Sequence, residues 1–352
     1  MRERGGAAPD CRPRPLVSTG LQSQPMDCSC AFATSPETPD HIAAAERIGY
    51  RRAWCYDSPA LYPDVWMTLA LAAERTSRIG LGPAVLVPSL RHPMVNAAAI
   101  ATLAGLAPGR VAVAIGAGFT GRYTLGQRAM RWSDVAAYVR ALRSLLRGED
   151  AVWEGAVTRM VHPTGFAPPR PIEVPILIGA DGPKGYQVAR QVGDGVFAAA
   201  LPPTDPDLPA WRALLTFGTV LGDGEDPGDP RVLQAAGHGL AVAFHALYER
   251  SGADGVDGLP GGVTWRTAIE QVPEERRHLA VHEDHLVRVS DRDLPAITEA
   301  SSLLPTLTLT GPADDVRQRI EQLSAMGVTE IAYQPAGPDI VGELERFRSA
   351  CG

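Results

Sequence analysis

The hydrophobic positions of the chain recur in one repeated unit, in which a short apolar run is followed by a loop and an amphipathic helix. The clearest example is the apolar run at 111–115, which is typical of a strand covered on both faces. A stripe with Val135, Val139 and Leu142 at helical spacing follows it, and Gly148 is expected to end that helix. The pattern therefore predicts alternating strands and helices.

Eight strands are predicted from such runs. They cover residues 27–33, 52–56, 79–87, 111–115, 175–179, 195–199, 215–221 and 329–334. Helices are expected to begin near residues 38, 63, 93, 133, 184 and 230, and a last one carries apolar residues between 316 and 326. Eight such units fit a (β/α)₈ TIM barrel, whose active site is expected at the carboxyl ends of the strands. A doubly wound open sheet is the main alternative.

Three segments depart from the repeat. Residues 1–25 contain arginines and prolines without an apolar centre, and we expect a disordered N-terminal extension there. Residues 149–173 are expected to form an excursion with short strands of their own. Residues 251–305, before the last helix-strand unit, are predicted to be an irregular insertion that covers the substrate. The remainder of 26–352 is predicted to be a single barrel domain.

The composition limits the classes of function. The 33 basic and 40 acidic residues give a net charge of -7, which argues against a nucleic-acid surface. No apolar stretch approaches the length of a membrane span, and no secretory signal is recognised. The five scattered cysteines favour a reducing compartment, so a cytoplasmic location is expected, and they are interpreted as small buried hydrophobes.

A glycine motif, Gly116-Ala117-Gly118-Phe119-Thr120-Gly121, matches G-x-G-x-x-G and follows an apolar strand. A dinucleotide fingerprint would open a helix directly, but the periodic helix begins only at Ser133, and three strand-helix units precede the motif. We therefore interpret the glycines as a loop that lets backbone approach a ligand closely.

A second glycine-rich turn, residues 179–185, lies between a strand and a helix. Free backbone N–H groups, the helix N-terminus and the charge of Lys184 would favour an anion there. An ordinary strand-to-helix turn with caps is an equally good interpretation.

Asp57 follows the second predicted strand. It is expected either to orient a ligand, to pair with Arg91 or Arg122, or simply to cap the loop that contains Ser58. Without an adjacent base, Ser58 is not a candidate nucleophile.

His278, His282 and His285 are spaced by four and three residues, which would place them on one helical face. That spacing invites a metal hypothesis, but no H-E-x-x-H pattern or cysteine partner accompanies it, so no metal is predicted. A substrate-side role in hydrogen bonding or acid–base chemistry is one interpretation, and a solvated surface helix is the other.

Several segments together resemble the bacterial luciferase-like superfamily, and more narrowly the branch that contains methylenetetrahydromethanopterin reductase. They are residues 50–57, 89–93, 100–103, 113–118, 176–183, 309–312 and 331–337. The resemblance covers most of the chain after residue 26. It implies a (β/α)₈ barrel that uses FMN or the deazaflavin coenzyme F420.

The resemblance also implies where a cofactor would bind. A bulge in the third strand, often with a non-proline cis peptide, supports the cofactor ring in this family, and the matching bond here is Ala84–Val85. The loops after the fourth and fifth strands approach the cofactor. The residues implicated on those loops are Gly116, Gly118, Phe119, Thr120, Gly179, Ala180, Gly182, Pro183 and Lys184.

The chain departs from the family pattern at some positions: Ser58 replaces a common His, Leu86 and Val87 replace polar residues, and Phe119 stands where the reductase branch often has Asp. The candidate catalytic groups are Asp57, Arg122, His282 and His285.

The expected activity is hydride transfer with F420 to a small-molecule substrate. FMN-dependent monooxygenation is the alternative, and a non-catalytic flavin-binding barrel is a second alternative. By analogy with the family, a homodimer is expected.

Overall fold

The computed structural model describes residues 26–351, and the predicted N-terminal extension lies outside them. Eight parallel strands form one sheet in the order β3-β2-β1-β10-β9-β8-β7-β4. They are β1 (Asp27–Phe32), β2 (Arg52–Cys55), β3 (Gly80–Pro83), β4 (Val113–Gly116), β7 (Ile176–Gly179), β8 (Gly195–Ala198), β9 (Trp211–Thr216) and β10 (Glu330–Tyr333). Bridges from Leu81 to Val111 and from Leu86 to Ile115 join β3 to β4. The sheet therefore closes into the predicted barrel, and the open-sheet alternative is wrong.

The strands are apolar throughout because both of their faces are covered. Outward residues such as Ile115 and Ile178 pack under the surrounding helices. The interior combines small residues with a few large ones: Trp54 on β2 points into the barrel and meets the ring of Phe197 on β8 edge-on at 5.4 Å. Ala114 and several other alanines on the remaining strands leave room for these rings.

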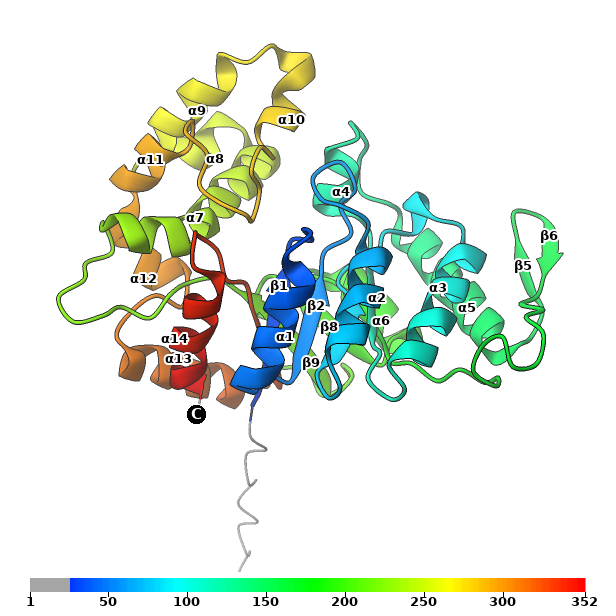
Figure 1. Cartoon of the computed structure of the whole chain (residues 1–352). Helices are drawn as coiled ribbons and strands as arrows, with labels where there is room; N and C mark the ends of the chain where they lie inside the picture. The colour runs from blue at the N-terminus through cyan, green and yellow to red at the C-terminus, as the bar shows by residue number, and fades with distance from the viewer. Residues whose placement is uncertain (1–25, 352) are drawn as a thin grey trace, which may run out of the picture.

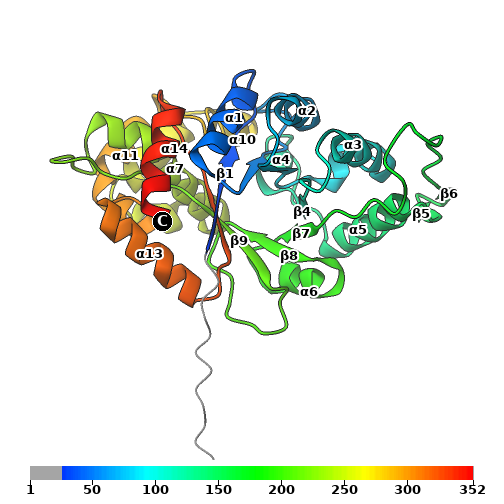
Figure 2. The same ribbon diagram turned by 60° about the horizontal axis from the view of Figure 1, so that its bottom comes forward.

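The barrel helices are α1 (Thr38–Ile48), α2 (Val65–Arg75), α3 (Pro93–Leu106), α5 (Trp132–Arg147), α6 (Pro183–Val192), α13 (Ala313–Ala325) and α14 (Ile340–Cys351). They surround the strands as Figure 2 shows. The predicted stripe of α5 is buried, and Gly148 ends this helix in the left-handed conformation at φ 77°. Gly49 ends α1 in the same way at φ 99°.

The predicted excursion forms a small antiparallel hairpin, β5 (Ala151–Trp153) and β6 (Ala156–Thr158). It extends away from the barrel beside α5 (Figure 1). Its cross-strand pair Val152 and Val157 is largely exposed, at 71% and 68%.

The insertion occupies its predicted place before α13 and β10, but it is not irregular. It forms α8 (Ala253–Asp257), α9 (Gly262–Glu270), α10 (Arg277–Ala280), α11 (Leu294–Glu299) and α12 (Leu304–Leu307). These helices form one unit with α7 (Pro230–Ser251), the helix that was predicted to begin near residue 230. This unit has its own apolar core around Trp265, Phe244 and Ile297, and it rises above the barrel in Figure 1. The prediction missed the helices because most of them are too short to show a helical period between the glycines and prolines.

The seventh strand begins four residues earlier than the predicted 215–221, since β9 covers Trp211–Thr216. Residues after β9 leave the barrel and pair with the segment before α13 instead. The N–H of Leu309 donates to the carbonyl of Phe217 at 2.7 Å, and the N–H of Leu221 donates to that of Gly311 at 2.9 Å. The apolar run at 215–221, which was predicted to be one strand, therefore belongs to two segments: the end of β9 and the part that pairs with residues 309–311. Gly218, at φ 140°, separates them.

Candidate active site

At the end of the barrel where the strands begin, the side chains of Glu330 and Arg52 lie against two tryptophans, Trp54 and Trp211, and close this end. The carboxylate of Glu330 accepts hydrogen bonds from Nε1 of Trp54 at 2.8 Å and Nε1 of Trp211 at 2.7 Å. The guanidinium of Arg52 lies 4.7 Å from the ring centre of Trp211, and its Nε is 3.9 Å from Glu330. We call these four residues the barrel floor. Because the floor fills this end, a ligand has to enter from the opposite end.

The opposite end is lined by residues at or just beyond the ends of the strands. We call the barrel mouth the set Ala33, Tyr56, Ala84, Val85, Gly116, Gly179, Leu215 and Gln334. On one side of the mouth Val85, Gly179 and Leu215 are half-exposed and Gly116 is buried. On the other side Tyr56 and Gln334 are buried and only Ala33 between them is half-exposed. We call the first the accessible side and the second the covered side.

The third strand carries the bulge that the resemblance implies. Its bridges to the fourth strand are at Leu81↔Val111 and Leu86↔Ile115, so five steps on one strand oppose four on the other. Ala84 and Val85 lie within this bulge, and the peptide bond between them is cis.

The side chain of Val85 rests on the paired glycines of β4 and β7. A Cβ added to Gly116 would lie 3.0 Å from one methyl group of Val85, and a Cβ on Gly179 would lie 2.4 Å from the other. These two glycines therefore make room for the bulge at the mouth, a packing reason that the motif alone did not reveal.

The loop after β4 continues into the one-turn helix α4 (Phe119–Tyr123), which contains Thr120, and the long helix α5 begins only at Trp132. Gly118 is left-handed at φ 80°, and a Cβ there would lie 2.5 Å from Val87. Phe119 is 48% exposed. The glycine motif therefore packs against the loop that follows the bulge.

Arg122, on α4, is held within its own neighbourhood. Its Nε donates to the carbonyl of Arg128 at 2.6 Å, and its Nη1 donates to Ser89 Oγ at 2.5 Å. Arg122 therefore links the loops after β3 and β4, and its catalytic role remains a prediction.

The loop after β7 borders the accessible side of the mouth. Ala180 is buried, and the carboxylate of Asp181 accepts hydrogen bonds from the N–H groups of Ala199 at 2.7 Å and Ala200 at 2.9 Å. These bonds tie this loop to the end of β8. Desolvation raises the pKa of Asp181, although these bonds and the charge of Arg250 lower it.

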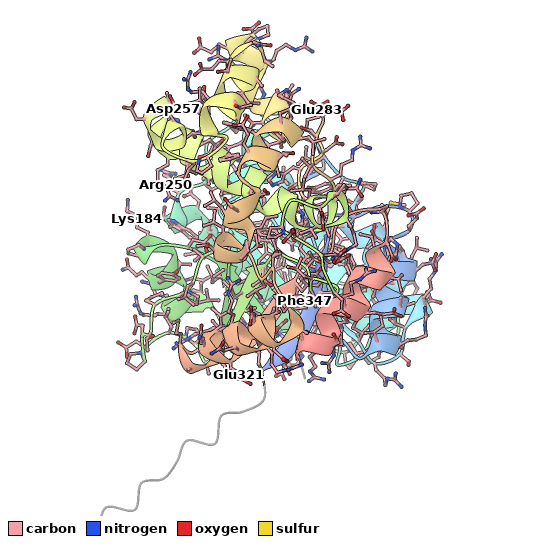
Figure 3. All side chains as sticks on the ribbon, turned by 90° about the vertical axis from the view of Figure 1, so that its left-hand side faces the viewer. Lys184, Arg250, Asp257, Glu283, Glu321 and Phe347 are labelled. Carbon is pink, nitrogen blue, oxygen red and sulfur yellow. The ribbon has the colours of Figure 1, made fainter. Side chains whose placement is uncertain are left out.

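Gly182 and Pro183 begin helix α6, and a Cβ at Gly182 would meet no atom within 4 Å. Lys184 is exposed in the first turn, and Figure 3 shows it on the same side of the molecule as Arg250, at the end of α7. Two cations and a free helix start therefore border this loop, which is the arrangement that the anion hypothesis requires.

Asp57 pairs with Arg91 rather than with Arg122. Both of its oxygens accept from Nη1 of Arg91, at 2.7 and 2.6 Å, while Nη2 of Arg91 donates to Asp64 at 2.8 Å. Asp64 in turn caps α2 through the N–H of Trp66. Desolvation raises the pKa of Asp57 by more than Arg91 lowers it. The carboxylate therefore joins the loops after β2 and β3, and we expect it to position the mouth.

The insertion contacts the covered side of the mouth through residues 282–288. The hydroxyl of Tyr62 donates to the carbonyl of His285, and Nε2 of Gln334 donates to that of Leu286 at 2.9 Å. The side chain of Leu286 packs into the apolar cluster that contains Tyr56 and Tyr62. This segment therefore lies on the mouth, while its role as a substrate cover remains a prediction.

The three histidines of the insertion do not share a helical face, because α10 ends at Ala280. His282 and His285 lie in the turns beyond it and are buried against His245 of α7. Their ring centres are 5.8 Å (His245 to His282), 5.6 Å (His245 to His285) and 5.2 Å (His282 to His285) apart. Within residues 26–351, no group of three or more His, Cys, Asp or Glu side chains is arranged to hold a metal ion.

Burial lowers the pKa of His245, His282 and His285, that of His285 to about 3, so this cluster is neutral at pH 7. Sequence reasoning missed His245 because it belongs to no motif. Its only signal is the seven-residue spacing from His238, which places both on the buried face of α7.

Several buried polar atoms lie where the insertion meets the barrel mouth, and they have no hydrogen-bond partner in the described residues. They are Tyr56 Oη, Gln334 Oε1, His285 Nδ1 and both ring nitrogens of His245. Such an atom costs about 1–3 kcal/mol and is uncommon in native structures. All of them are uncharged, and Tyr56 and Gln334 belong to the mouth. Hydrogen-bonding capacity is therefore left unused at the mouth and in the histidine cluster.

The fold and the site define a (β/α)₈ barrel with a bulged third strand and a glycine-lined mouth. The chain belongs to the luciferase-like monooxygenase family, whose model matches residues 17–330. Among the described residues, no helix is long and apolar enough to cross a membrane.

Relatives of known name give this family a context. The 5,10-methylenetetrahydromethanopterin reductase of Archaeoglobus fulgidus is 27% identical over 85% of this chain and 90% of its own length. The F420-dependent hydroxymycolic acid dehydrogenase of Mycobacterium tuberculosis is 33% identical over 67% of this chain and 69% of its own. The structure of the F420-dependent tetrahydromethanopterin reductase from Methanopyrus kandleri superposes with a TM-score of 0.64 at 21% identity, covering 92% of this chain and 98% of that one. This structural likeness supports the barrel fold.

Proposed function

We propose that the protein is an oxidoreductase that uses coenzyme F420 at the barrel mouth to reduce or oxidise a small organic substrate. The observation that carries the proposal is the bulge of β3, where Val85 is seated on Gly116 and Gly179 at the accessible side of the mouth. The F420-dependent hydroxymycolic acid dehydrogenase, which matches 67% of the chain, supports the choice of cofactor. FMN with oxygenation is the second candidate, because the matching family model is that of luciferase-like monooxygenases.

The cofactor site is proposed along the loops after β3, β4 and β7. Bound F420 would supply a two-electron hydride donor or acceptor. Ala84 and Val85 would support its ring, while the free helix start at Gly182 and Pro183, with Lys184, would favour its negative groups. The remaining contacts are assigned to Gly116, Gly118, Phe119, Thr120, Gly179 and Ala180.

The substrate side is proposed at the covered half of the mouth. Burial raises the pKa of Tyr56, so its hydroxyl keeps its proton and can donate a hydrogen bond to a substrate oxygen. Gln334 Oε1 and His285 Nδ1 add neutral hydrogen-bonding groups, and Leu286 with Tyr62 excludes water. The arrangement suits an uncharged carbonyl or hydroxyl compound, because its unpaired groups are all uncharged. His282 would support the ring of His285.

A homodimer is proposed through α2 and α3. Helix α3 has no charged residue over Pro93–Leu106, yet Val95 is 53% exposed, and on the neighbouring α2 Met67 is 72% exposed. An apolar face of this kind is typical of an interface. Light scattering should give twice the chain mass for the wild type and the single mass for Met67→Glu; a monomeric wild type would contradict this proposal.

The proposed location is the cytoplasm. Four cysteines within the described residues, Cys28, Cys30, Cys55 and Cys351, are free thiols.

The direct test of the proposed function is a fluorescence titration of the purified protein with F420 and, separately, with FMN. We expect saturable binding of F420 that is at least tenfold tighter than that of FMN. Preference for FMN would favour the monooxygenase candidate, and binding of neither would refute both.

A further inference from the structure

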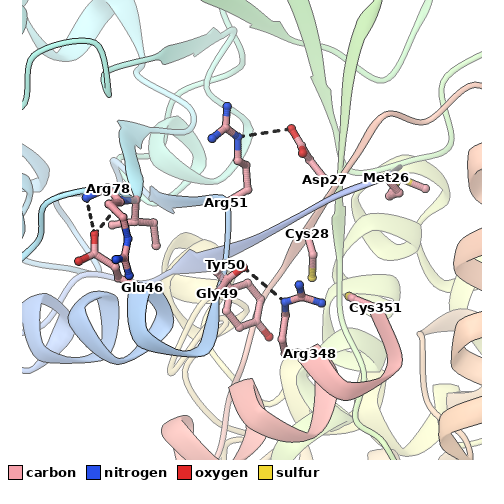
Figure 4. A pocket seen from close by; sticks show the side chains of 11 residues that line it. Met26, Asp27, Cys28, Glu46, Gly49, Tyr50, Arg51, Arg78, Arg348 and Cys351 are labelled. Carbon is pink, nitrogen blue, oxygen red and sulfur yellow. Dashed lines mark hydrogen bonds and ion pairs between the residues drawn. The ribbon is translucent and has the colours of Figure 1, made fainter. Parts of the chain in front are cut away.

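A pocket of about 370 Å³ lies on the face opposite the mouth, at the amino ends of the strands. It is formed where β1 begins, where α1 passes into β2 at Gly49 and Tyr50, and where α14 ends (Figure 4). No residue of the mouth lines this pocket, so it is a separate site from the proposed active site.

Two thiols, on segments far apart in sequence, line this pocket together. Cys28 on β1 faces outward from the barrel and is 7% exposed, while Cys351, in the last turn of α14, is half-buried. Figure 4 shows both side chains at the same wall, beside Arg348. The neighbouring Cys351 side chain and burial raise the pKa of the Cys28 thiol, whereas the charge of Arg348 lowers it.

The end of α14 is fixed against this wall by contacts that do not involve sulfur. The hydroxyl of Tyr50 donates to the carbonyl of Leu344 at 2.8 Å, in a buried hydrogen bond. Nε of Arg348 donates to the carbonyl of Gly49 at 3.4 Å. The two thiols are therefore held next to each other by the fold before any reaction, which favours a bond between them over reaction with other thiols.

We propose that Cys28 and Cys351 form a thiol-modification site that reacts with a low-molecular-weight disulfide entering the pocket. In the first step the thiol of Cys351, the more exposed of the two, loses its proton to water. Its thiolate displaces one half of the small disulfide as a thiolate and forms a mixed disulfide. Cys28 then loses its proton and attacks the sulfur of Cys351, which releases the second half. Two protein thiols are oxidised, and one small disulfide is reduced to two thiols.

The raised pKa of Cys28 has a kinetic consequence. Because the thiolate is the attacking species, the second step should be slower than the first, and the mixed disulfide on Cys351 should accumulate transiently. The other two described thiols provide an internal comparison. Cys30 and Cys55 are completely buried and do not line the pocket, so neither should react in the folded protein.

The test is a time course of intact mass for the folded protein in glutathione disulfide, in a Cys11→Ser background that removes the fifth cysteine. We expect a transient glutathione adduct, followed by a product that has lost the mass of two hydrogen atoms. Proteolysis without reductant should then yield one cross-linked peptide pair that contains Cys28 and Cys351. The oxidised protein should also melt at a higher temperature, because the bond closes a loop of almost the whole described chain.

Two variants make the outcome decisive. Cys28→Ser should stop at a stable adduct on Cys351, and Cys351→Ser should show neither adduct nor cross-link. The proposal would be overturned if the wild type did not react, or if it kept the adduct without cross-linking. It would also be overturned if Cys351→Ser reacted as readily as the wild type. Reaction of the same samples in urea verifies that all thiols were reduced at the start.

Discussion

The barrel floor and the barrel mouth lie at opposite ends of the same strands, and they differ in how their buried polar groups are partnered. At the floor both oxygens of Glu330 accept tryptophan N–H groups, and its charge faces Arg52, whose buried Nε is 3.9 Å away and has no hydrogen-bond partner in the described residues. At the mouth the hydroxyl of Tyr56 and Oε1 of Gln334 are buried, uncharged and likewise without a partner there. The floor is therefore organised around a carboxylate with both oxygens bonded, which supports the fold, whereas the unpartnered groups of the mouth are neutral.

The largest predicted effect lies at the floor. Glu330→Ala leaves the Arg52 charge and two tryptophan N–H groups buried without their acceptor, so we expect a loss of about 3–5 kcal/mol in the free energy of unfolding. Urea denaturation followed by fluorescence measures it. Glu330→Gln retains an acceptor oxygen and should lose less. A Glu330→Gln variant as stable as the wild type would show that the charge has no role, whereas equal losses in both variants would show that the charge carries the whole effect.

Acidification should destabilise the protein through its buried histidines. Burial lowers the pKa of His238 to about 4 and that of His285 to about 3, so between these values and pH 6.5 the unfolded chain binds more protons than the folded one. Each such group therefore removes up to about 1.4 kcal/mol of stability per pH unit as the pH falls below 6.5. Unfolding in urea at about pH 7.5, which lies above this window, and at about pH 6 and 5, which lie within it, measures the slope. His238→Leu should flatten it; an unchanged slope would exclude His238 as a source.

The packing of Val85 against Gly116 and Gly179 should control the affinity of the mouth for F420. A Cβ at Gly179 would come within 2.4 Å of Val85, so Gly179→Ala should displace the bulge. We expect a loss of at least about tenfold in affinity, which is about 1.4 kcal/mol. Gly258→Ala is the matched control, since a Cβ there meets nothing within 4 Å. If both variants bind F420 as the wild type does, the bulge is not part of the cofactor site.

The smallest predicted effect is also the most specific to the mouth. Tyr56→Phe removes a buried hydroxyl that has no partner, so the free protein should become more stable by about 1 kcal/mol. Tyr62→Phe is the contrast, because its hydroxyl donates to the carbonyl of His285 and its removal should destabilise. Thermal melting of the two variants compares them directly. A destabilised Tyr56→Phe would mean that this hydroxyl has a partner in solution.

Much of the fold could be predicted from the sequence, because a strand that is buried on both faces consists of a continuous apolar run that is visible locally. The runs at Val113 and Ile176 illustrate this, and each became a barrel strand. The start of β9 was missed because Trp211 and Arg212 gain their strand character from their partners Gly195 and Val196 on β8. Pairing between distant segments does not appear in a local pattern.

The site was less predictable for the same reason. The bulge and the glycines of the mouth followed from the resemblance, but their packing through Val85 depends on three strands at once. Tyr56 and Gln334 lie in segments that carry the resemblance but received no role there, and His245 belongs to no motif. The contacts of Gln334 with Leu286 and of His245 with His285 form only when the insertion folds. Asp57 could be placed at the end of a strand, but only the structure distinguishes Arg91 from Arg122 as its partner.

Hydrogen–deuterium exchange with and without F420 tests the central claim most directly, because it reports on both ends of the barrel in one experiment. We predict that F420 slows exchange in the loops after β3, β4 and β7, and leaves the floor strands around Trp54, Trp211 and Glu330 unchanged. Unchanged exchange at these loops despite saturating F420, or protection centred on the floor, would contradict the account.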